Sequence, residues 1–486
     1  MSRIITKLHP EIIAKTAARC RERGIIIPTF AELRDPETIP ARVRKKLPGV
    51  GLWDVNPLNL FRITWKNDVR SGGYGSVNFF EVPREITGVR PRIIGLIGKF
   101  FPTGAHKVGA AFGCLVPRLV SGSFDPDTHK AVWPSTGNYC RGGAFDCALL
   151  GCTAIAILPE EMSAERFTWL REIGADVIAT PGCESNVKEI YDKCHELRTG
   201  PRNVILNQFE EFGNPIFHYN VTGPAIQEVF ESLDTSHRAA AYVSATGSAG
   251  TIAAGDFLKT RHPHLRVIAT EALQCPTLFM NGFGGHRIEG IGDKHVPWVH
   301  NVRNTDAVAA IDDEDCLRIL RLFNEPAGRD YLLASGVHED DAAQLPLLGI
   351  SSICNVLAAI KTAKYFELDE RDVVFTIFTD SVEMYRSRLT ELATTRGAYQ
   401  RDDALRDFAG PLASQRIDFF KELTYYERKA IHHLKYYTWV EQQGKTSEEL
   451  NAQWDPDYWR ALFEEEVVYF DELIRDFNRA VGLSEA

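Results

Sequence analysis

The sequence predicts an α/β protein built around a parallel sheet. Over about residues 76–395, short apolar runs alternate with longer helical patterns. Strands of a parallel sheet are apolar along their length, because helices cover both faces of the sheet. Strands that alternate with helices indicate βαβ units. The predicted strands are residues 92–97, 154–158, 176–179, 203–206, 241–244, 267–270 and 373–378.

The two ends of the chain differ from this middle region. Residues 1–75 carry an amphipathic helical pattern and then a basic, proline-containing stretch, which predicts an N-terminal extension. Residues 396–486 are charged and aromatic and predict a helical C-terminal extension. Apolar residues recur there on one helical face, at Trp459, Leu462, Phe463, Val467, Phe470, Leu473, Ile474 and Phe477. The sequence leaves open whether this face packs on the chain's own core or adds to a dimer interface.

The composition excludes several classes of function. The chain has 486 residues, with 55 Lys and Arg against 65 Asp and Glu, and a formal net charge of −10. Such a chain has no overall attraction for nucleic acid or an anionic membrane, so we expect neither as a partner. We expect no signal peptide and no membrane span. Ten cysteines without CxxC or zinc spacing predict reduced thiols in a cytoplasmic protein and no metal site, with a disulfide framework as the alternative.

Turns after the predicted strands carry the chemistry, because ligands of open α/β sheets bind beyond the carboxyl ends of strands. Residues 247–251 are small or hydroxyl-bearing and precede a helix. Backbone N–H groups in such a turn can close around a phosphate. No GKS/T lysine is present, which excludes a nucleotide-triphosphate loop. An ordinary tight turn is the alternative.

Lys107 stands at the start of an otherwise apolar helix after the strand at 92–97. Burial of a lysine lowers the stability of a protein, so a buried lysine usually has a functional role. Burial lowers the pKa of the amine and makes it a nucleophile suited to Schiff-base chemistry. The alternative is a surface lysine at a helix start.

Two further turns carry polar groups. The hydroxyl and amide side chains of residues 135–139 suit a carboxylate or a phenolic oxygen, although Ser and Thr also cap helices routinely. Asp380 and Ser381 follow the strand at 373–378 and, taken alone, would only cap the next helix.

In this order and spacing, the segments resemble the fold-type II family of pyridoxal-phosphate enzymes, and most closely its cysteine synthase and cystathionine β-synthase branch. The matching segments are residues 102–107, 135–138, 207–209, 218–224, 247–251, 289–292, 349–352 and 379–381. The resemblance implies two α/β domains, with parallel or mixed sheets, around the cofactor. The large cofactor-binding domain would comprise 76–110 and 216–395, and the smaller mobile domain 111–215, with the asparagine loop.

The resemblance also implies roles for individual residues. Lys107 would hold pyridoxal 5′-phosphate covalently and later take the Cα proton. Further cofactor-binding residues would be His106, Asn138, Gly247, Ser248, Ala249, Gly250, Thr251 and Ser381. Substrate-binding residues would be Ser135, Thr136, Gly137, Asn138, Tyr139, Gln208 and Gly290. Ser381 would face the pyridine nitrogen. Because serine is not an acid, the ring would stay mostly unprotonated, which favours loss of a β-substituent over transamination.

The implied activity is β-elimination or β-replacement on a β-substituted L-amino acid through an aminoacrylate intermediate. The family habit implies a homodimer with a small amino-acid substrate. Two alternatives remain open: an amino-acid dehydratase or ammonia-lyase of the same fold, and a non-catalytic homologue that binds the cofactor or a partner.

The departures from the family pattern concern the substrate pocket. Tyr139 stands where cysteine synthases have a small hydroxyl residue. The segment at 104–107 resembles the tryptophan synthase β subunit, in which the histidine lies near the phosphate. Lys294 and His295 follow the turn at 290–292. We expect this cation near the pocket mouth to favour an anionic or strongly polar β-substituent; the alternative is an exposed loop.

Overall fold

Two β-sheets organise the protein in the computed structural model, which describes residues 3–483. The larger sheet has seven strands in the order β1-β2-β10-β7-β8-β9-β11, and the smaller has four in the order β5-β4-β3-β6. Only the edge strands β1 and β11 pair antiparallel to their neighbours; every other pairing between these strands is parallel. The predicted α/β class, with parallel and mixed sheets, is confirmed.

The larger sheet consists of β1 (Phe79–Val82), β2 (Arg92–Ile97), β7 (Arg238–Ala245), β8 (Arg266–Ala272), β9 (Ala307–Ile311), β10 (Asp372–Phe378) and β11 (Phe420–Glu422). The smaller sheet consists of β3 (Lys130–Pro134), β4 (Thr153–Pro159), β5 (Asp176–Thr180) and β6 (Asn203–Ile205). All seven predicted strands are present, and β1, β3, β9 and β11 are not among the predicted strands. Three of the five residues of β9 are alanine, which does not favour strands.

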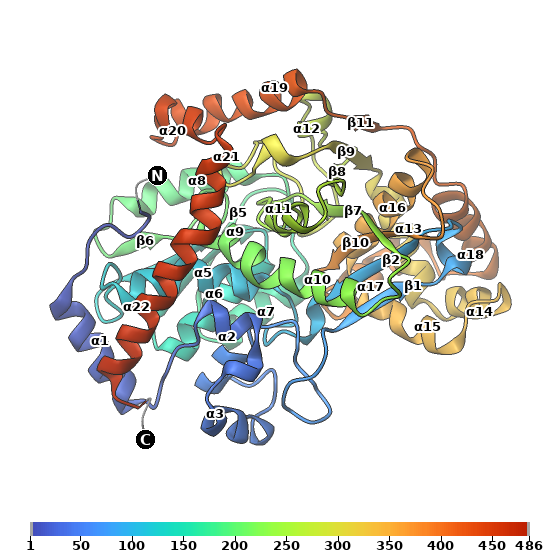
Figure 1. Cartoon of the computed structure of the whole chain (residues 1–486). Coiled ribbons are helices and arrows are strands. Elements are labelled where there is room, and N and C mark those ends of the chain that lie inside the picture. Colours follow the sequence, from blue (N-terminus) through green and yellow to red (C-terminus); the bar gives the residue numbers. More distant parts are fainter. Residues whose placement is uncertain (1–2, 484–486) are drawn as a thin grey trace.

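Helices pack around both sheets and form most of the two ends of the chain (Figure 1). The first nine are α1 (Pro10–Glu22), α2 (Phe30–Arg34), α3 (Ala41–Lys46), α4 (Arg84–Thr87), α5 (Lys107–Val120), α6 (Asn138–Leu150), α7 (Ala164–Glu172), α8 (Val187–Arg198) and α9 (Gly213–Phe217). Those that follow up to residue 407 are α10 (Gly223–Glu231), α11 (Ile252–Arg261), α12 (Thr277–Met280), α13 (Asp313–Asn324), α14 (Pro326–Ala334), α15 (Glu339–Gln344), α16 (Ile350–Tyr365), α17 (Arg386–Arg396) and α18 (Arg401–Asp407). The C-terminal extension contains α19 (Tyr425–Lys435), α20 (Ser447–Ala452), α21 (Pro456–Arg460) and α22 (Glu466–Val481).

The two ends of the chain pack against each other and against α5. Helix α22, red in Figure 1, runs across α5 and α1. The Phe30 ring lies 5.6 Å from that of Phe112 and 6.2 Å from that of Phe470. The Asp471 carboxylate accepts hydrogen bonds from the Phe30 and Ala31 amides, at 2.7 and 3.2 Å. All eight apolar residues of the predicted C-terminal face are buried. That face therefore packs on the chain's own core, and it is not free for a dimer interface.

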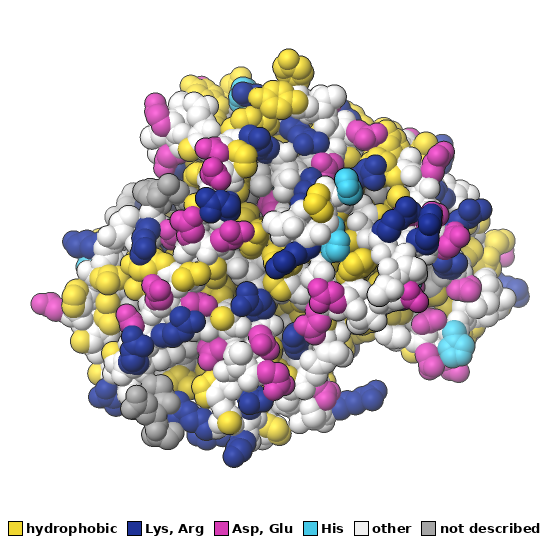
Figure 2. Space-filling view, in the orientation of Figure 1, with side chains coloured by type: hydrophobic (Ala, Val, Ile, Leu, Met, Phe, Trp, Pro, Cys, Tyr) yellow, Lys and Arg dark blue, Asp and Glu magenta, His cyan; other side chains and the backbone are white. Residues whose placement is uncertain are grey.

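The surface charges, the cysteines and the helix lengths test what the composition led us to expect about charge, disulfides and membrane spans. On the face shown in Figure 2, acidic and basic side chains are interspersed. All ten cysteines are free thiols, and eight of them are buried, so the disulfide alternative does not apply. Within residues 3–483, no single helix has the length and apolar character to cross a membrane; Glu339–Leu347 and Ile350–Tyr365 meet that test only as a pair, across a bend of 119°.

Candidate active site

A narrow cavity lies where strands of both sheets end. It is lined by Lys107, Ser135, Thr136, Asn138, Tyr139, Glu184, Gln208, Phe209, Gly247, Ser248, Gly290 and Gly292. Most of these residues follow the carboxyl ends of β2, β3, β5, β6 and β7. The cavity therefore occupies the position at which α/β sheets bind ligands.

Lys107 is the first residue of α5, and its side chain is buried at the cavity wall. Its Nζ donates one long hydrogen bond, 3.3 Å, to the Ser248 hydroxyl. Burial lowers the pKa of Lys107 to about 8, against an opposing effect of the Glu184 carboxylate. A neutral, nucleophilic amine is thus accessible near neutral pH.

The turn at residues 247–251 connects β7 to the N-terminus of α11. The Ser248 hydroxyl accepts a hydrogen bond from Asn214 Nδ2 at 3.0 Å, and the Ser244 and Thr251 hydroxyls lie 2.7 Å apart. At Gly250, a Cβ atom would lie 2.0 Å from Asn214 Oδ1, so only glycine fits there. The turn is tight, rich in hydroxyl groups and backed by a helix N-terminus, a combination that suits a phosphate.

The loop at residues 135–139 connects β3 to α6. The Ser135 hydroxyl accepts a hydrogen bond from the Gly137 amide at 3.0 Å. Gly137 has φ +143°, and a Cβ there would lie 2.3 Å from the Arg166 side chain, so the position requires glycine. Asn138 Nδ2 donates to the Asp380 carboxylate at 2.7 Å, which leaves the buried Asn138 Oδ1 without a protein partner. The Tyr139 hydroxyl donates to the Leu206 carbonyl at 3.0 Å and holds the ring against the cavity.

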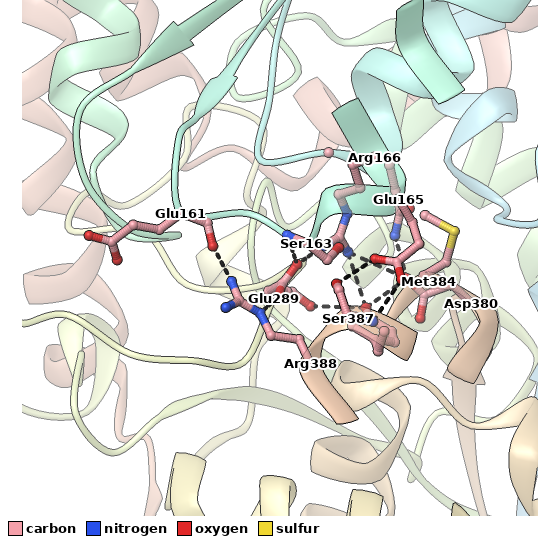
Figure 3. Close-up of polar contacts among 12 residues, drawn as sticks. Glu161, Ser163, Glu165, Arg166, Glu289, Asp380, Met384, Ser387 and Arg388 are labelled. Carbon is pink, nitrogen blue, oxygen red and sulfur yellow. Dashed lines mark hydrogen bonds and ion pairs between the residues drawn. The ribbon is translucent and has the colours of Figure 1, made fainter. Parts of the chain in front are cut away.

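A buried polar network joins the small-sheet region to the segments after β8 and β10 (Figure 3). Arg166 of α7 forms an ion pair with Glu289 and donates to the Tyr385 hydroxyl at 3.1 Å. The Tyr385 hydroxyl donates to the Asp380 carboxylate at 2.8 Å, and Asp380 also accepts from Asn138. The network thus fixes the asparagine loop against the end of β10.

The outer part of this network continues along α17 (Figure 3). The Arg388 guanidinium donates to Glu289 Oε1 at 2.6 Å. The Ser387 amide and hydroxyl donate to the two oxygens of Glu165 at 2.7 and 2.6 Å. The network therefore ties α7 to Glu289 and to the segment from Asp380 to α17. Sequence analysis did not identify this network, because its members are ordinary charged residues until the fold brings them together.

The residues of the cavity fit pyridoxal 5′-phosphate. Lys107 supplies an amine for the aldehyde carbon, and the turn at 247–251 supplies hydroxyl groups and the N-terminus of α11 for the phosphate. The unpartnered Asn138 Oδ1 supplies a polar atom for a ring substituent. All these groups are buried, which suits the pyridine ring of the cofactor, since the ring has apolar faces and polar substituents at its edge.

Nine residues of the predicted site line the cavity: Lys107, Ser135, Thr136, Asn138, Tyr139, Gln208, Gly247, Ser248 and Gly290. Gly137, Ala249, Gly250, Thr251, Ser381 and His106 are not among the lining residues. The first four belong to the two loops that form the cavity, and Ser381 adjoins Asp380 in the network. The His106 ring instead stacks on Trp65 and meets His218 edge to face, at 5.6 and 5.1 Å. Burial lowers the pKa of His106 well below its usual value.

The cation expected at the pocket mouth is not found there. Lys294 and His295 are half-buried and line no part of the cavity. His295 Nδ1 lies 2.8 Å from the Asp293 carboxylate, and its ring packs on Tyr191. Of the turn at 290–292 and the residues after it, only Gly290 and Gly292 line the cavity. The other ionisable side chain that lines the cavity with Lys107 and Tyr139 is Glu184.

Glu184 is the functional candidate that sequence analysis missed. It lies in the turn between β5 and α8. The strand at 176–179 was predicted, so an inspection of the turn beyond its carboxyl end would have drawn attention to this carboxyl group.

Comparisons with known proteins agree with this geometry. The family model described as "Pyridoxal-phosphate dependent enzyme" matches residues 99–339. A cysteine synthase of Staphylococcus aureus is 30% identical over 288 residues, which is 59% of this chain and 84% of that protein. The cystathionine β-synthase of Saccharomyces cerevisiae is 27% identical over 317 residues, 63% of this chain and 59% of that protein.

Solved structures agree as well. An O-acetylserine-dependent cystathionine β-synthase from Helicobacter pylori has a TM-score of 0.54 and 25% identity, over 64% of this chain and 95% of that chain. A hydrogen sulfide-producing enzyme from Fusobacterium nucleatum has a TM-score of 0.55 and 22% identity, over 64% of this chain and 97% of that chain, and shows likeness of fold.

Proposed function

The chain belongs to the pyridoxal-phosphate-dependent enzyme family, in its cysteine synthase and cystathionine β-synthase branch, and from that premise we propose that it removes the β-substituent of an L-amino acid. The second half of the reaction is either addition of a nucleophile, which is β-replacement, or release of the product, which is β-elimination. The narrow cavity, lined mainly by hydroxyl, amide and glycine residues, favours a small amino-acid substrate.

Lys107 carries the central role in this proposal. When bound, pyridoxal phosphate supplies the electron sink that makes the Cα–H bond of an amino acid breakable. The Lys107 amine holds the cofactor and afterwards takes the Cα proton. A pKa near 8 suits this task, because the amine can both accept and return a proton near neutral pH.

The asparagine loop is proposed to receive the substrate carboxylate. Ser135 and Thr136 bring hydroxyl groups to the cavity, and α6 begins at Asn138 with its N-terminus toward the loop. Hydroxyl groups and a helix N-terminus both favour an anion. Gln208 lines the cavity as well and adds an amide.

Ser381 is proposed to lie at the pyridine nitrogen. Its residue is buried, and Asn138 and Tyr385 both donate to Oδ2 of the neighbouring Asp380. The serine hydroxyl can hydrogen-bond the ring nitrogen, and it does not protonate the ring as an acid would.

The observation that carries the proposal is a buried lysine with one long hydrogen bond, to Ser248 of the hydroxyl-rich turn before α11. The purified protein should be yellow, and adding a panel of β-substituted amino acids should change its absorbance and yield pyruvate or sulfide. A colourless protein that gains no band on addition of pyridoxal phosphate would overturn the cofactor assignment. A coloured protein that turns over no β-substituted amino acid would overturn the reaction.

We also propose a homodimer in the cytoplasm. The family habit supports the dimer, and ten free thiols, eight of them buried, support a reducing compartment. Light scattering during size-exclusion chromatography should give twice the mass of one chain, and a monomer would contradict the assembly.

A further inference from the structure

Glu184 is a buried carboxyl group in the same cavity as Lys107. Its residue is 1% exposed. It lines the cavity, and neither of its oxygens has a protein hydrogen-bond partner of normal geometry, although the Thr136 hydroxyl and the Gly290 amide lie near enough to lower its pKa. Burial of an unpaired carboxyl group lowers the stability of a protein. Its presence in the wall of this cavity therefore indicates a role in the reaction.

Glu271 shows what a structural carboxyl group at the same depth looks like. Both Glu271 oxygens accept backbone hydrogen bonds, from the Leu278 amide at 2.9 Å and the Phe279 amide at 2.8 Å. Burial raises the pKa of both Glu184 and Glu271 to about 8. The two groups therefore differ in their surroundings: backbone amides hydrogen-bond both oxygens of Glu271, whereas Glu184 lines a cavity and has no protein hydrogen bond of normal geometry.

The turn that carries Glu184 is held in place. The Ser185 hydroxyl donates to the Gly284 carbonyl at 2.7 Å, which ties the turn to the loop after α12. The Cys183 amide donates to Asn186 Oδ1 at 3.2 Å. A carboxyl group fixed in this way can serve a defined atom of a substrate.

Burial favours the protonated form of Glu184, against Arg166, Thr136, the Gly290 amide and Lys107, which all lower its pKa. Thr136 belongs to the loop proposed to bind the substrate carboxylate, and an ionised Glu184 beside it would repel that group. A neutral carboxylic acid avoids the repulsion and keeps an O–H to donate. Arg166, the cation that most opposes this effect, is engaged with Glu289.

We propose that Glu184 is a general acid that protonates the departing β-substituent. The inference rests on the proposed function. When the Cβ–X bond breaks, its electron pair goes to X, and the proton moves from the Glu184 carboxyl oxygen to X, so that the substituent leaves as HX. Glu184 is left as a carboxylate. It regains its proton from the incoming nucleophile in β-replacement, or from water in β-elimination.

The test compares leaving groups that need a proton with leaving groups that do not. β-Chloroalanine and O-acetylserine release chloride and acetate, which are stable anions, whereas cysteine and serine release groups that leave as sulfide and water. In the holoenzyme, Glu184→Gln keeps the shape and removes the proton. It should lower kcat/KM for cysteine and serine by about 10²- to 10⁴-fold, and for β-chloroalanine and O-acetylserine by less than about threefold. Glu184→Asp should retain part of the activity toward cysteine and serine.

The controls separate this effect from others. Glu161→Gln removes an exposed carboxyl group that does not line the cavity, and it should leave the activity toward all four donors unaffected. An equal loss for all four donors in Glu184→Gln would overturn the proposal, because it would make Glu184 a ligand of the substrate carboxylate. A loss that follows the charge of the substituent instead of its basicity would also overturn it.

The proposed function and this inference fail in different ways. If the wild-type holoenzyme processes none of the four donors, the proposed function fails. If it processes β-chloroalanine and O-acetylserine but neither cysteine nor serine, the proposed function stands and the general-acid role of Glu184 is overturned.

Discussion

Two buried lysines, Lys107 and Lys435, show how one residue type serves chemistry in one region and structure in another. Lys435 of α19 donates to the Trp298 and His300 carbonyls and to Gln453 Oε1, at 2.9, 2.7 and 2.7 Å. These three acceptors match the three N–H bonds of an ammonium group. Lys107 has a single bond of 3.3 Å and faces a cavity.

Burial lowers the pKa of both lysines, so a lowered pKa alone does not identify an active-site amine. What distinguishes Lys107 is an amine left largely free at the wall of a cavity. Lys435 joins the C-terminal extension to the segment after the 290–292 turn, and each of its donors is occupied. The comparison predicts that loss of Lys107 abolishes the reaction and that loss of Lys435 weakens the fold.

The largest effect is expected for Lys107→Ala. Because the variant lacks both the covalent attachment and the base, turnover should fall by about 10³-fold or more. Cofactor should still bind, without a covalent link, and the absorbance spectrum should report the difference. Turnover close to that of the wild type would show that another residue performs these roles.

Lys435→Met should act on stability. The methionine keeps the apolar stem that packs near Trp298 and Trp459, but leaves three buried acceptors without a donor. The free energy of unfolding should fall by about 2–4 kcal/mol, measured by denaturant titration. The matched control, Lys429→Met on the half-buried side of the same helix, should change it by less than about 1 kcal/mol. Equal losses in the two variants would contradict the structural role of Lys435.

Ser381→Asp tests the residue that we place at the pyridine nitrogen of the cofactor. An acid at the pyridine nitrogen should protonate the ring, slow β-elimination by about tenfold and increase side reactions. Ser381→Ala, which removes the hydroxyl without adding an acid, is the control and should stay within about threefold of the wild type. If the rate of the Asp variant is unchanged, Ser381 does not lie at the ring nitrogen.

The smallest effect concerns pH. In cofactor-free protein, covalent attachment of added pyridoxal phosphate needs a neutral Lys107 amine, and its pKa is about 8 because burial outweighs the opposing charge of Glu184. The attachment rate, followed by absorbance, should rise about tenfold per pH unit below 8 and level off above it. A rate that keeps rising to pH 10 would indicate an ordinary, solvated amine.

Sequence alone predicted much of the fold because buried parallel strands are apolar runs between helices. It did not predict β11, a three-residue edge strand that contains Lys421 and Glu422. Nor could it decide where the C-terminal apolar face packs, since the same pattern serves a core and an interface. Only the fold shows that α22 covers α1 and α5.

The sequence likewise predicted some residues of the candidate site and missed others. Lys107 and the two loops at 135–139 and 247–251 were found because glycine, hydroxyl and lysine residues follow predicted strands. The network of Arg166, Glu289 and Asp380 was not found, because nothing in the local sequence links residues more than a hundred positions apart. The role expected for Lys294 was wrong because loop direction is set by tertiary contacts.

The most direct test of the assignment of Lys107 is chemical. The holoprotein is reduced with borohydride, which fixes a cofactor bound to a lysine, and the attachment site is located by digestion and mass spectrometry. The account predicts the added pyridoxyl-phosphate mass on the peptide that contains Lys107. The same mass on another lysine, such as the neighbouring Lys99, or on none, would contradict it.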